Sequence, residues 1–397
     1  MIRLARGSRQ LGSYFLCFAL IAVVAIICSW HLKQGLQLSA DSASYIAWAN
    51  ALLEVEFDYA VFLSNNQFFT PLFFYLAPIT LIASLMHVFG ENWQAVFFWI
   101  NLGFSAATIL ITVLTLRLVK VRDWVIACAL LMFLISDAYL TWPGYMLTDS
   151  FYAFLTAMLV YWLVRSAISN QVYWLPLLFV SLIIVLTRPT SPALITSLIL
   201  FFMVWRFMAF EISWRQAVLL IFSLAGLATM IFVLLITAYL RGWLDSQQVG
   251  FIVASAIEGR VVGARYETYW PNSGQAMELG RLFFLRIAYF FSPTAQTFSW
   301  FHNALNLMFF GLVLLGSALL MWRSALIDRS LRVFVFVALI FSFTTAVFHA
   351  FTIIDFDWRY RYPIISLFIG LVAVGFEHFI RLIPTNMFTP NDERLPR

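Results

Sequence analysis

Eleven apolar runs, each long enough or nearly long enough to cross a bilayer as a helix, follow one another along this chain. They constrain its fold more than any other feature, because a bilayer core has no water to satisfy exposed backbone groups. Only 11% of the 397 residues are charged and 63% are hydrophobic, whereas a soluble chain carries about a quarter of charged residues. We therefore expect an all-α, polytopic membrane protein with a single integral membrane domain over 1–397.

Basic residues between the runs predict the topology, because cytoplasmic loops of membrane proteins are enriched in Lys and Arg. The candidate runs are 14–30, 71–89, 94–118, 124–140, 151–167, 172–187, 190–209, 216–240, 303–322, 332–350 and 363–383. If 71–89 crossed the membrane, the basic residues at 117–122 and every later basic loop would fall outside. Pro71 and Pro78 also suit a helix that lies along the interface. We therefore predict about ten transmembrane helices.

This topology places both termini in the cytoplasm, and we expect the protein in the cytoplasmic (inner) membrane. The outer face then receives 31–93, 138–150, a turn at Arg188, a long loop over 241–302, and 351–362. The inner face receives only short basic loops. Such asymmetry predicts an active site on the outer face, with interfacial helices in the first outer loop, 31–93.

Several classes of function have no sequence signal. Cys17, Cys28 and Cys128 all lie in apolar runs, so neither a disulfide framework nor a cysteine metal site is indicated. The net charge of +5 is not gathered into a basic stripe, so no nucleic-acid partner is expected. Membrane lipids are the expected surroundings.

Two acids on the predicted outer face stand in similar contexts. Asp41 is followed by Ser42 and, four residues on, by Tyr45; Asp149 is followed by Ser150 and soon by an aromatic residue. If a helix begins at about Ser42, Asp41 is its N-cap and Tyr45 lies over the same face. A cap or a solvated charge is the ordinary role of such an acid, and two acids from separate loops can also converge on one pocket.

Five places in the chain resemble the GT-C superfamily of integral membrane glycosyltransferases, which includes the aminoarabinose and protein mannosyl transferases. They are Asp41-Ser42 with Tyr45, the stretch from Pro71 to Phe89-Gly90-Glu91 with Asn101 and Arg117 after it, Leu147-Thr148-Asp149-Ser150, Leu186-Thr187-Arg188-Pro189-Thr190, and Asp357-Trp358-Arg359-Tyr360-Arg361-Tyr362-Pro363. These places cover most of the first 200 residues and one point near the end. The loop over 241–302 resembles nothing in that superfamily.

The resemblance implies transfer of a sugar, with inversion, from a polyprenyl-phosphate-linked donor to a lipid, glycan or protein acceptor on the outer (periplasmic) side. Asp41 would be the general base and Asp149 would assist it. Tyr45, Arg188, Arg359 and Arg361 would bind substrate, since arginine can clamp the donor phosphate. No cofactor is certain; a divalent metal held by the two acids is possible in this superfamily.

Alternatives remain at this stage. A flippase or exporter of lipid-linked sugars would also use outer arginines, but it would gain nothing from two acids on one face and should carry polar residues deep in several crossings. An enzyme similar to an O-antigen polymerase or ligase would depend on outer arginine and histidine instead of an acid in the first loop. The segment 279–291 alternates basic and aromatic residues, and it suits either a lipid groove or simple anchoring.

Overall fold

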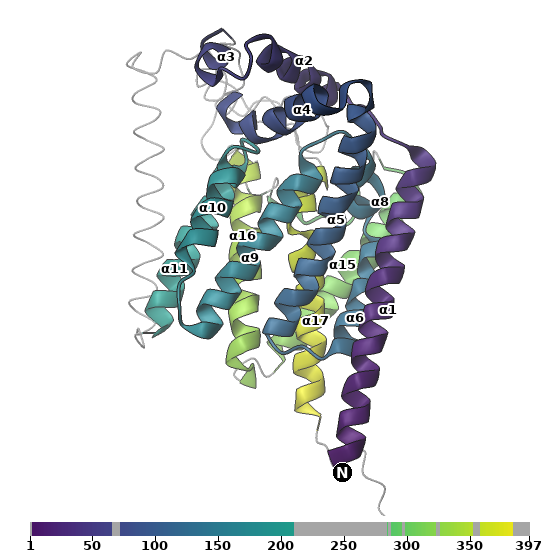
Figure 1. Cartoon of the computed structure of the whole chain (residues 1–397). Coiled ribbons are helices and arrows are strands. Elements are labelled where there is room, and N and C mark those ends of the chain that lie inside the picture. The colour runs from purple at the N-terminus through teal and green to yellow at the C-terminus, as the bar shows by residue number, and fades with distance from the viewer. Residues whose placement is uncertain are drawn as a thin grey trace, which may run out of the picture.

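The chain folds into a bundle of long helices capped at one end by a layer of shorter ones (Figure 1). This computed structural model describes residues 2–65, 72–209, 284, 287–295, 298–322, 326–351 and 358–383. The described part is helical, and its only strand-like pairing is a single parallel bridge between Gln37 and Tyr145. The prediction of an all-α protein is therefore confirmed for this part of the chain.

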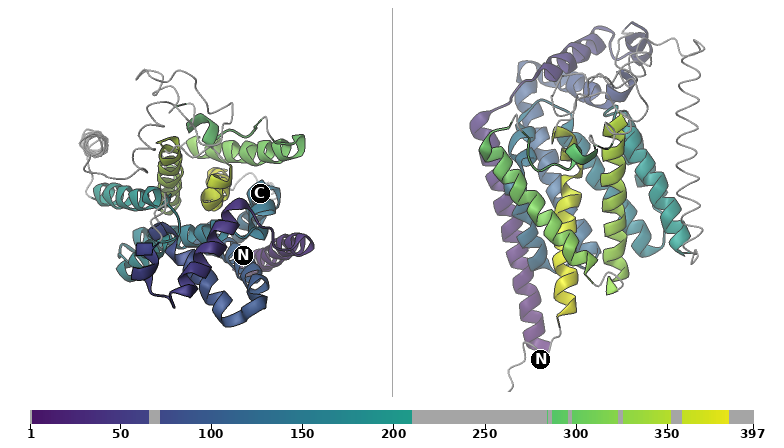
Figure 2. Two further views of the ribbon diagram at one scale, coloured as in Figure 1. Left: turned by 90° about the horizontal axis from the view of Figure 1, so that it is seen from above. Right: turned by 180° about the vertical axis from the view of Figure 1, so that it is seen from behind.

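Some helices of the bundle run toward the capping layer and others run away from it (Figures 1 and 2). Its long members are α1 (Ile2–Gln34), α5 (Trp93–Leu118), α9 (Asp149–Ser169), α11 (Ser191–Ala209), α15 (Trp300–Met321), α16 (Arg329–Phe351) and α17 (Ile365–Leu382); its shorter members are α6 (Asp123–Leu130), α7 (Met132–Ile135), α8 (Asp137–Thr141) and α10 (Trp174–Val185). The N-terminal end of α1 and the C-terminal end of α17 lie at the same end of the bundle (Figure 1).

Six described helical stretches are long and apolar enough to cross a membrane, which identifies a membrane protein. A seventh arises if α6–α7 and α8 with its continuation form one span, although they are bent by 63°. The apolar helix α10 has 12 residues and rises about 18 Å, less than a hydrocarbon core of about 30 Å. The run 216–240 lies outside the described residues. Ten crossings therefore remain a prediction.

The capping layer consists of α2 (Ala40–Glu54), α3 (Tyr59–Asn65), the 3₁₀ turn η1 (Leu72–Tyr75) and α4 (Leu76–Phe89). Figure 1 shows α4 with α2 over the end of the bundle rather than within it. Its own buried core includes Leu52, Phe62 and Ile82. Gly90 ends α4 with a φ of 51°, a conformation that favours glycine, and so lets the chain turn into α5.

The centre of the bundle packs tightly around α17, the most buried of the candidate spans. Gly316 of α15 and Gly375 of α17 face each other so closely that a Cβ on either would meet the backbone of the other helix. Small residues at such a crossing are the usual way for membrane helices to approach. This closely packed centre supports the residues at the capped end of the bundle.

Candidate functional site

Asp41 lies in the first turn of α2, and it is not the N-cap that the sequence suggested. Ser39 caps this helix: its Oγ accepts the amide N–H of Ser42, and the Ser42 hydroxyl accepts the amide N–H of Ser39 at 2.9 Å. This reciprocal pair is a capping box. The carboxylate of Asp41 is therefore not occupied with capping, and 49% of the side chain is exposed.

The start of α2 is tied to the loop before α9 by backbone hydrogen bonds. Gln37 donates its amide to the carbonyl of Gly144 at 2.8 Å, and Met146 donates its amide to the carbonyl of Gln37 at 2.9 Å. The Ser42 hydroxyl donates to the Met146 carbonyl at 2.8 Å, so the second serine of the capping box also holds the loop. These bonds bring the two acid-containing segments, which are more than a hundred residues apart, to one place.

Asn101 of α5 holds the same loop from below. Its side-chain amide donates to the carbonyls of Pro143 at 2.8 Å and Tyr145 at 3.0 Å. The asparagine that formed part of the family resemblance thus has a positioning role, fixing the loop that leads into Asp149.

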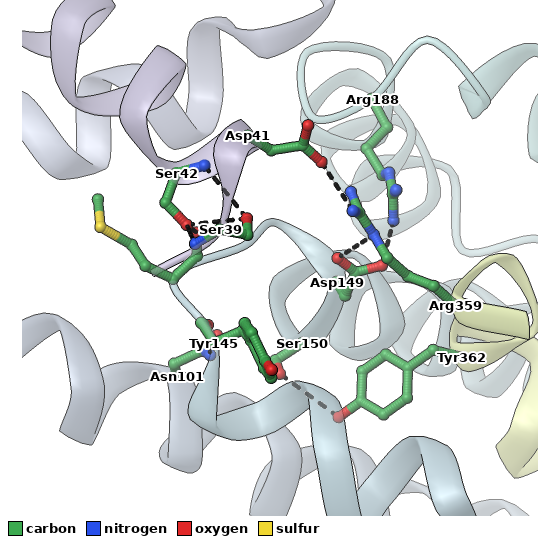
Figure 3. A network of polar contacts seen from close by, with 11 residues as sticks. Ser39, Asp41, Ser42, Asn101, Tyr145, Asp149, Ser150, Arg188, Arg359 and Tyr362 are labelled. Carbon is green, nitrogen blue, oxygen red and sulfur yellow. Dashed lines mark hydrogen bonds and ion pairs between the residues drawn. The ribbon is translucent and has the colours of Figure 1, made fainter. Parts of the chain in front are cut away.

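Asp149 is the first residue of α9, and its side chain is fully buried. One carboxylate oxygen accepts Nη1 of Arg188 at 2.5 Å, and the other accepts Nε of Arg359 at 3.1 Å (Figure 3). Arg188 comes from the turn between α10 and α11, and Arg359 from the 3₁₀ segment η5 (Trp358–Ile364). A buried carboxylate is stable only with such partners.

Arg359 joins the two acids. While its Nε contacts Asp149, its Nη1 donates to Oδ2 of Asp41 at 2.7 Å (Figure 3). We call Asp41, Asp149, Arg188 and Arg359 the Asp149 cluster. Its two arginines are nearly buried, with side chains 5% and 15% exposed, and Asp41 is its one half-exposed member.

Aromatic rings surround the guanidinium groups. The Arg188 guanidinium lies over the rings of Tyr152 and Tyr360, at 5.9 and 5.5 Å from their centroids, and that of Arg359 lies over Trp142 at 6.0 Å. Burial lowers the pKa of Arg188, but the Asp149 carboxylate and nearby tyrosines raise it by more, so the pKa is raised overall. Arg188 therefore keeps its charge.

Tyr45 is buried beside this cluster, one turn along α2 from Asp41. Its ring contacts those of Trp48 and Tyr75, with centroids 5.9 and 5.6 Å away. Burial, with a smaller effect of Tyr75, raises the pKa of the Tyr45 phenol far above neutrality. The hydroxyl is thus protonated and can donate a hydrogen bond.

Arg361 does not join the cluster, although the sequence grouped it with Arg359. Its Nη2 donates to the backbone carbonyls of Tyr289 at 3.0 Å and Ser292 at 2.8 Å, and its guanidinium lies over Phe310. The reason is the 3₁₀ geometry of η5, in which each residue turns about 120° and residues two apart point to different sides. Arg361 instead fastens the end of the 241–302 loop to the bundle.

Residues to which the sequence analysis assigned no role support the cluster. The hydroxyl of Tyr362 lies 3.1 Å from that of Ser105 and 3.4 Å from that of Ser150, which neighbours Asp149. Tyr75 and Trp142 were also missed, because single aromatic residues in a chain with 42 phenylalanines carry no signal. Only the fold distinguishes them.

Other acids that the sequence predicted on the outer face have ordinary roles. Asp58 caps α3, where its Oδ1 accepts the amides of Ala60 and Val61 at 3.0 Å, and Asp137 pairs with His302 at 3.4 Å. The segment 279–291 lies outside the described residues except for Phe284 and 287–291, and so does most of the loop over 241–302.

A metal bridging Asp41 and Asp149 does not fit the arrangement. The guanidinium of Arg359 contacts both carboxylates and holds the position that such an ion would take. Within the described ranges, no three His, Cys, Asp or Glu side chains gather as metal ligands would.

The chain was also compared with known proteins. No protein-family model, curated protein or solved structure matches it.

Proposed function

We propose that this protein is a glycosyltransferase that takes a sugar from a polyprenyl-phosphate carrier and passes it to an acceptor at the capped end of the bundle. The observation that carries the proposal is the contact of Arg359 with both acids, at 2.7 Å to the half-exposed Asp41 and 3.1 Å to the buried Asp149. An accessible carboxylate next to nearly buried guanidinium groups offers both a base and an anion clamp.

In the proposed reaction, the acceptor hydroxyl or amine attacks the anomeric carbon of the donor sugar. Asp41 takes the proton of the acceptor, a new bond forms at the anomeric carbon, and the bond from that carbon to the phosphate oxygen breaks. The bonding electrons leave with the lipid phosphate, which gains negative charge. Attack from the face opposite the phosphate inverts the configuration.

The ion pair of Asp41 with Arg359 links removal of the acceptor proton to departure of the phosphate. When Asp41 takes the proton it loses its charge, and its hold on Arg359 weakens. The guanidinium of Arg359 can then stabilise the negative charge that develops on the departing phosphate. Arg188 provides a second guanidinium, while Asp149 orients both arginines and balances part of their charge.

The role of Asp149 in this proposal differs from the one that the sequence suggested, which was to assist Asp41 by orienting the acceptor or by holding a metal. A fully buried carboxylate that already accepts two guanidinium groups is poorly placed to reach an acceptor. Tyr45 and the partly exposed rings of Trp48 and Tyr75 would bind the sugar, with rings packing against its apolar face and the phenol donating a hydrogen bond.

The first experiment identifies the donor. In a strain that lacks this protein, the lipid-linked sugar that it consumes should accumulate and can be identified by mass spectrometry of the lipid extract. Membranes that contain the protein should then transfer that sugar.

The second experiment replaces the base. Asp41→Asn keeps the shape of the side chain and leaves the Ser39 cap in place, but an amide cannot accept the proton. Transfer should fall about a hundredfold to ten-thousandfold, with normal membrane insertion. Glu54→Gln, at the exposed far end of the same helix, is the matched control and should transfer normally. Full transfer activity of Asp41→Asn would contradict the assignment of Asp41 as the general base.

A further inference from the structure

A small cavity lies beside Arg188, in the bundle under the capped end. Its volume is about 10 Å³, and its lining includes Arg188, Thr190, Tyr152 of α9, and Thr345 and His349 of α16. Space of this size holds about one oxygen atom of a water or an oxyanion. No carboxylate belongs to its lining in the part of the chain that the structure describes.

Thr345 makes this cavity unusual. Buried threonines in these helices donate to the carbonyl four residues earlier, as the adjacent Thr344 does to Ile340 at 2.7 Å and Thr112 does to Thr108 at 2.7 Å. The Oγ1 of Thr345, a residue only 6% exposed, has no hydrogen-bond partner among the described residues. A buried hydroxyl without a partner is costly, so it needs a reason.

The electrostatics of the lining favour an anion. Arg188 carries a positive charge, and Tyr152, Thr190 and Thr345 add hydroxyl groups that can donate; those of Tyr152 and Thr345 have no hydrogen-bond partner among the described residues. The cavity also lies next to the N-terminal end of α11, where the helix dipole favours negative charge. Asp149 is shared between two arginines, so the buried part of the cluster has one positive charge in excess.

We infer that this cavity receives one non-bridging oxygen of a lipid-linked phosphate, which is a phosphodiester in the sugar donor and a monoester in the product, with Arg188 and the hydroxyls of Thr345 and Tyr152 as its donors. The inference rests on the proposed function for the source of that phosphate, the polyprenyl carrier. It specifies how the donor is held: the phosphate enters next to Arg188, and the sugar remains on the side of Asp41.

Binding to the full chain in lipid nanodiscs tests the site, with farnesyl phosphate, farnesol and inorganic phosphate as probes. Farnesyl phosphate should bind much more tightly than farnesol, which has no phosphate. Thr345→Val keeps the shape but removes the hydroxyl, and it should weaken farnesyl phosphate binding about tenfold while leaving farnesol unchanged. Tyr152→Phe should act in the same direction.

Ser342→Ala is the matched control. Ser342 lies one turn away on α16, is 4% exposed and also has no partner for its hydroxyl among the described residues, but it does not line the cavity. Its variant should bind all probes as the wild type does. Thr345→Val should also melt at a temperature no lower than that of the wild type, because it removes an unpaired hydroxyl.

Unchanged phosphate binding in both Thr345→Val and Tyr152→Phe would overturn the inference. If inorganic phosphate binds as tightly as farnesyl phosphate and loses affinity in the same variants, the site is supported and its source is free phosphate. If the protein binds phosphate normally but transfers no sugar, the phosphate site is supported and the proposed function is contradicted. If sugar transfer depends on Asp41 but not on Thr345, the proposed function is supported and the phosphate site is contradicted.

Discussion

Two ion clusters at opposite ends of the bundle are built from the same parts. At the capped end, buried Asp149 accepts two arginines, and one of these, Arg359, reaches on to half-exposed Asp41. At the other end, buried Glu377 of α17 accepts Arg122 at 3.1 Å and Arg381 at 2.8 Å. Arg381 reaches on to Asp328 at 2.7 Å, which is 47% exposed. We call these four residues the Glu377 cluster.

The clusters differ in where the arginines lie. In the Glu377 cluster the arginine side chains are 42% and 31% exposed, so they keep much of their hydration. In the Asp149 cluster they are 5% and 15% exposed. Burial of two guanidinium groups is expensive and contributes little net stability. The Glu377 cluster therefore has the character of a structural staple, whereas the Asp149 cluster has a cost that a binding or catalytic role would explain.

The Glu377 cluster joins segments that are far apart in the sequence. Arg381 also donates to the carbonyl of Lys120 at 2.6 Å, in the turn between α5 and α6. Nearby, Arg117 pairs with Asp123 through two bonds of 2.9 Å. These contacts fasten the end of the bundle where α1 begins and α17 ends.

The largest expected difference between the two ends is their side of the membrane. In a protein without its three native cysteines, Asn92→Cys, next to the capping layer, should react with an impermeant thiol probe added from outside. Lys120→Cys, at the Glu377 cluster, should not react until the membrane is permeabilised. The reverse pattern would contradict the predicted topology and the predicted location of the Asp149 cluster on the outer face.

Asp149→Asn should destabilise the fold by about 3–5 kcal/mol, because it leaves Arg188 buried without a full counter-charge. Thermal unfolding in detergent measures this loss. The double variant Asp149→Asn with Arg188→Met should recover part of the stability, since it removes one of the stranded charges. A loss below about 1 kcal/mol in the single variant would mean that water reaches Arg188 freely.

Arg188→Lys should keep the fold, because the ammonium can still pair with Asp149, but it lacks the planar fork of arginine. Donor use should weaken by about 1–3 kcal/mol, seen as a lower kcat/KM for the lipid-linked sugar. Arg117→Lys, which alters a two-bond pair with Asp123 at the far end, is the matched control and should transfer at the normal rate. Equal kinetics in the two variants would assign Arg188 to packing.

Glu377→Gln should have the smallest effect, about 1–2 kcal/mol of stability and none on transfer. Its partners Arg122 and Arg381 are exposed enough to be hydrated once the charge is gone. Comparison of unfolding curves at low and high salt checks the assignment, since screening weakens exposed ion pairs. A loss as large as that of Asp149→Asn would abolish the contrast between the clusters.

The sequence by itself determined the class of the protein and much of its plan. Apolar runs separated by basic loops are sufficient for a membrane helix bundle, because hydrocarbon leaves the backbone no other partner than itself. The counting of crossings also put Asp41, Asp149, Arg188 and Arg359 in segments of one predicted face, and the fold brings these four together.

Only the tertiary structure decided how those residues are used. The sequence placed Asp41 at the N-cap of a helix beginning at about Ser42, whereas Ser39 caps this helix and Asp41 lies in its first turn. It grouped Arg361 with Arg359, whereas the 3₁₀ turn separates them. It gave the two acids similar local contexts, but Asp149 is fully buried and Asp41 is 49% exposed. Burial depends on which helices pack around a residue, and local sequence does not encode that. The same dependence hid the cavity beside Thr345, whose lining comes from four separate segments of the chain.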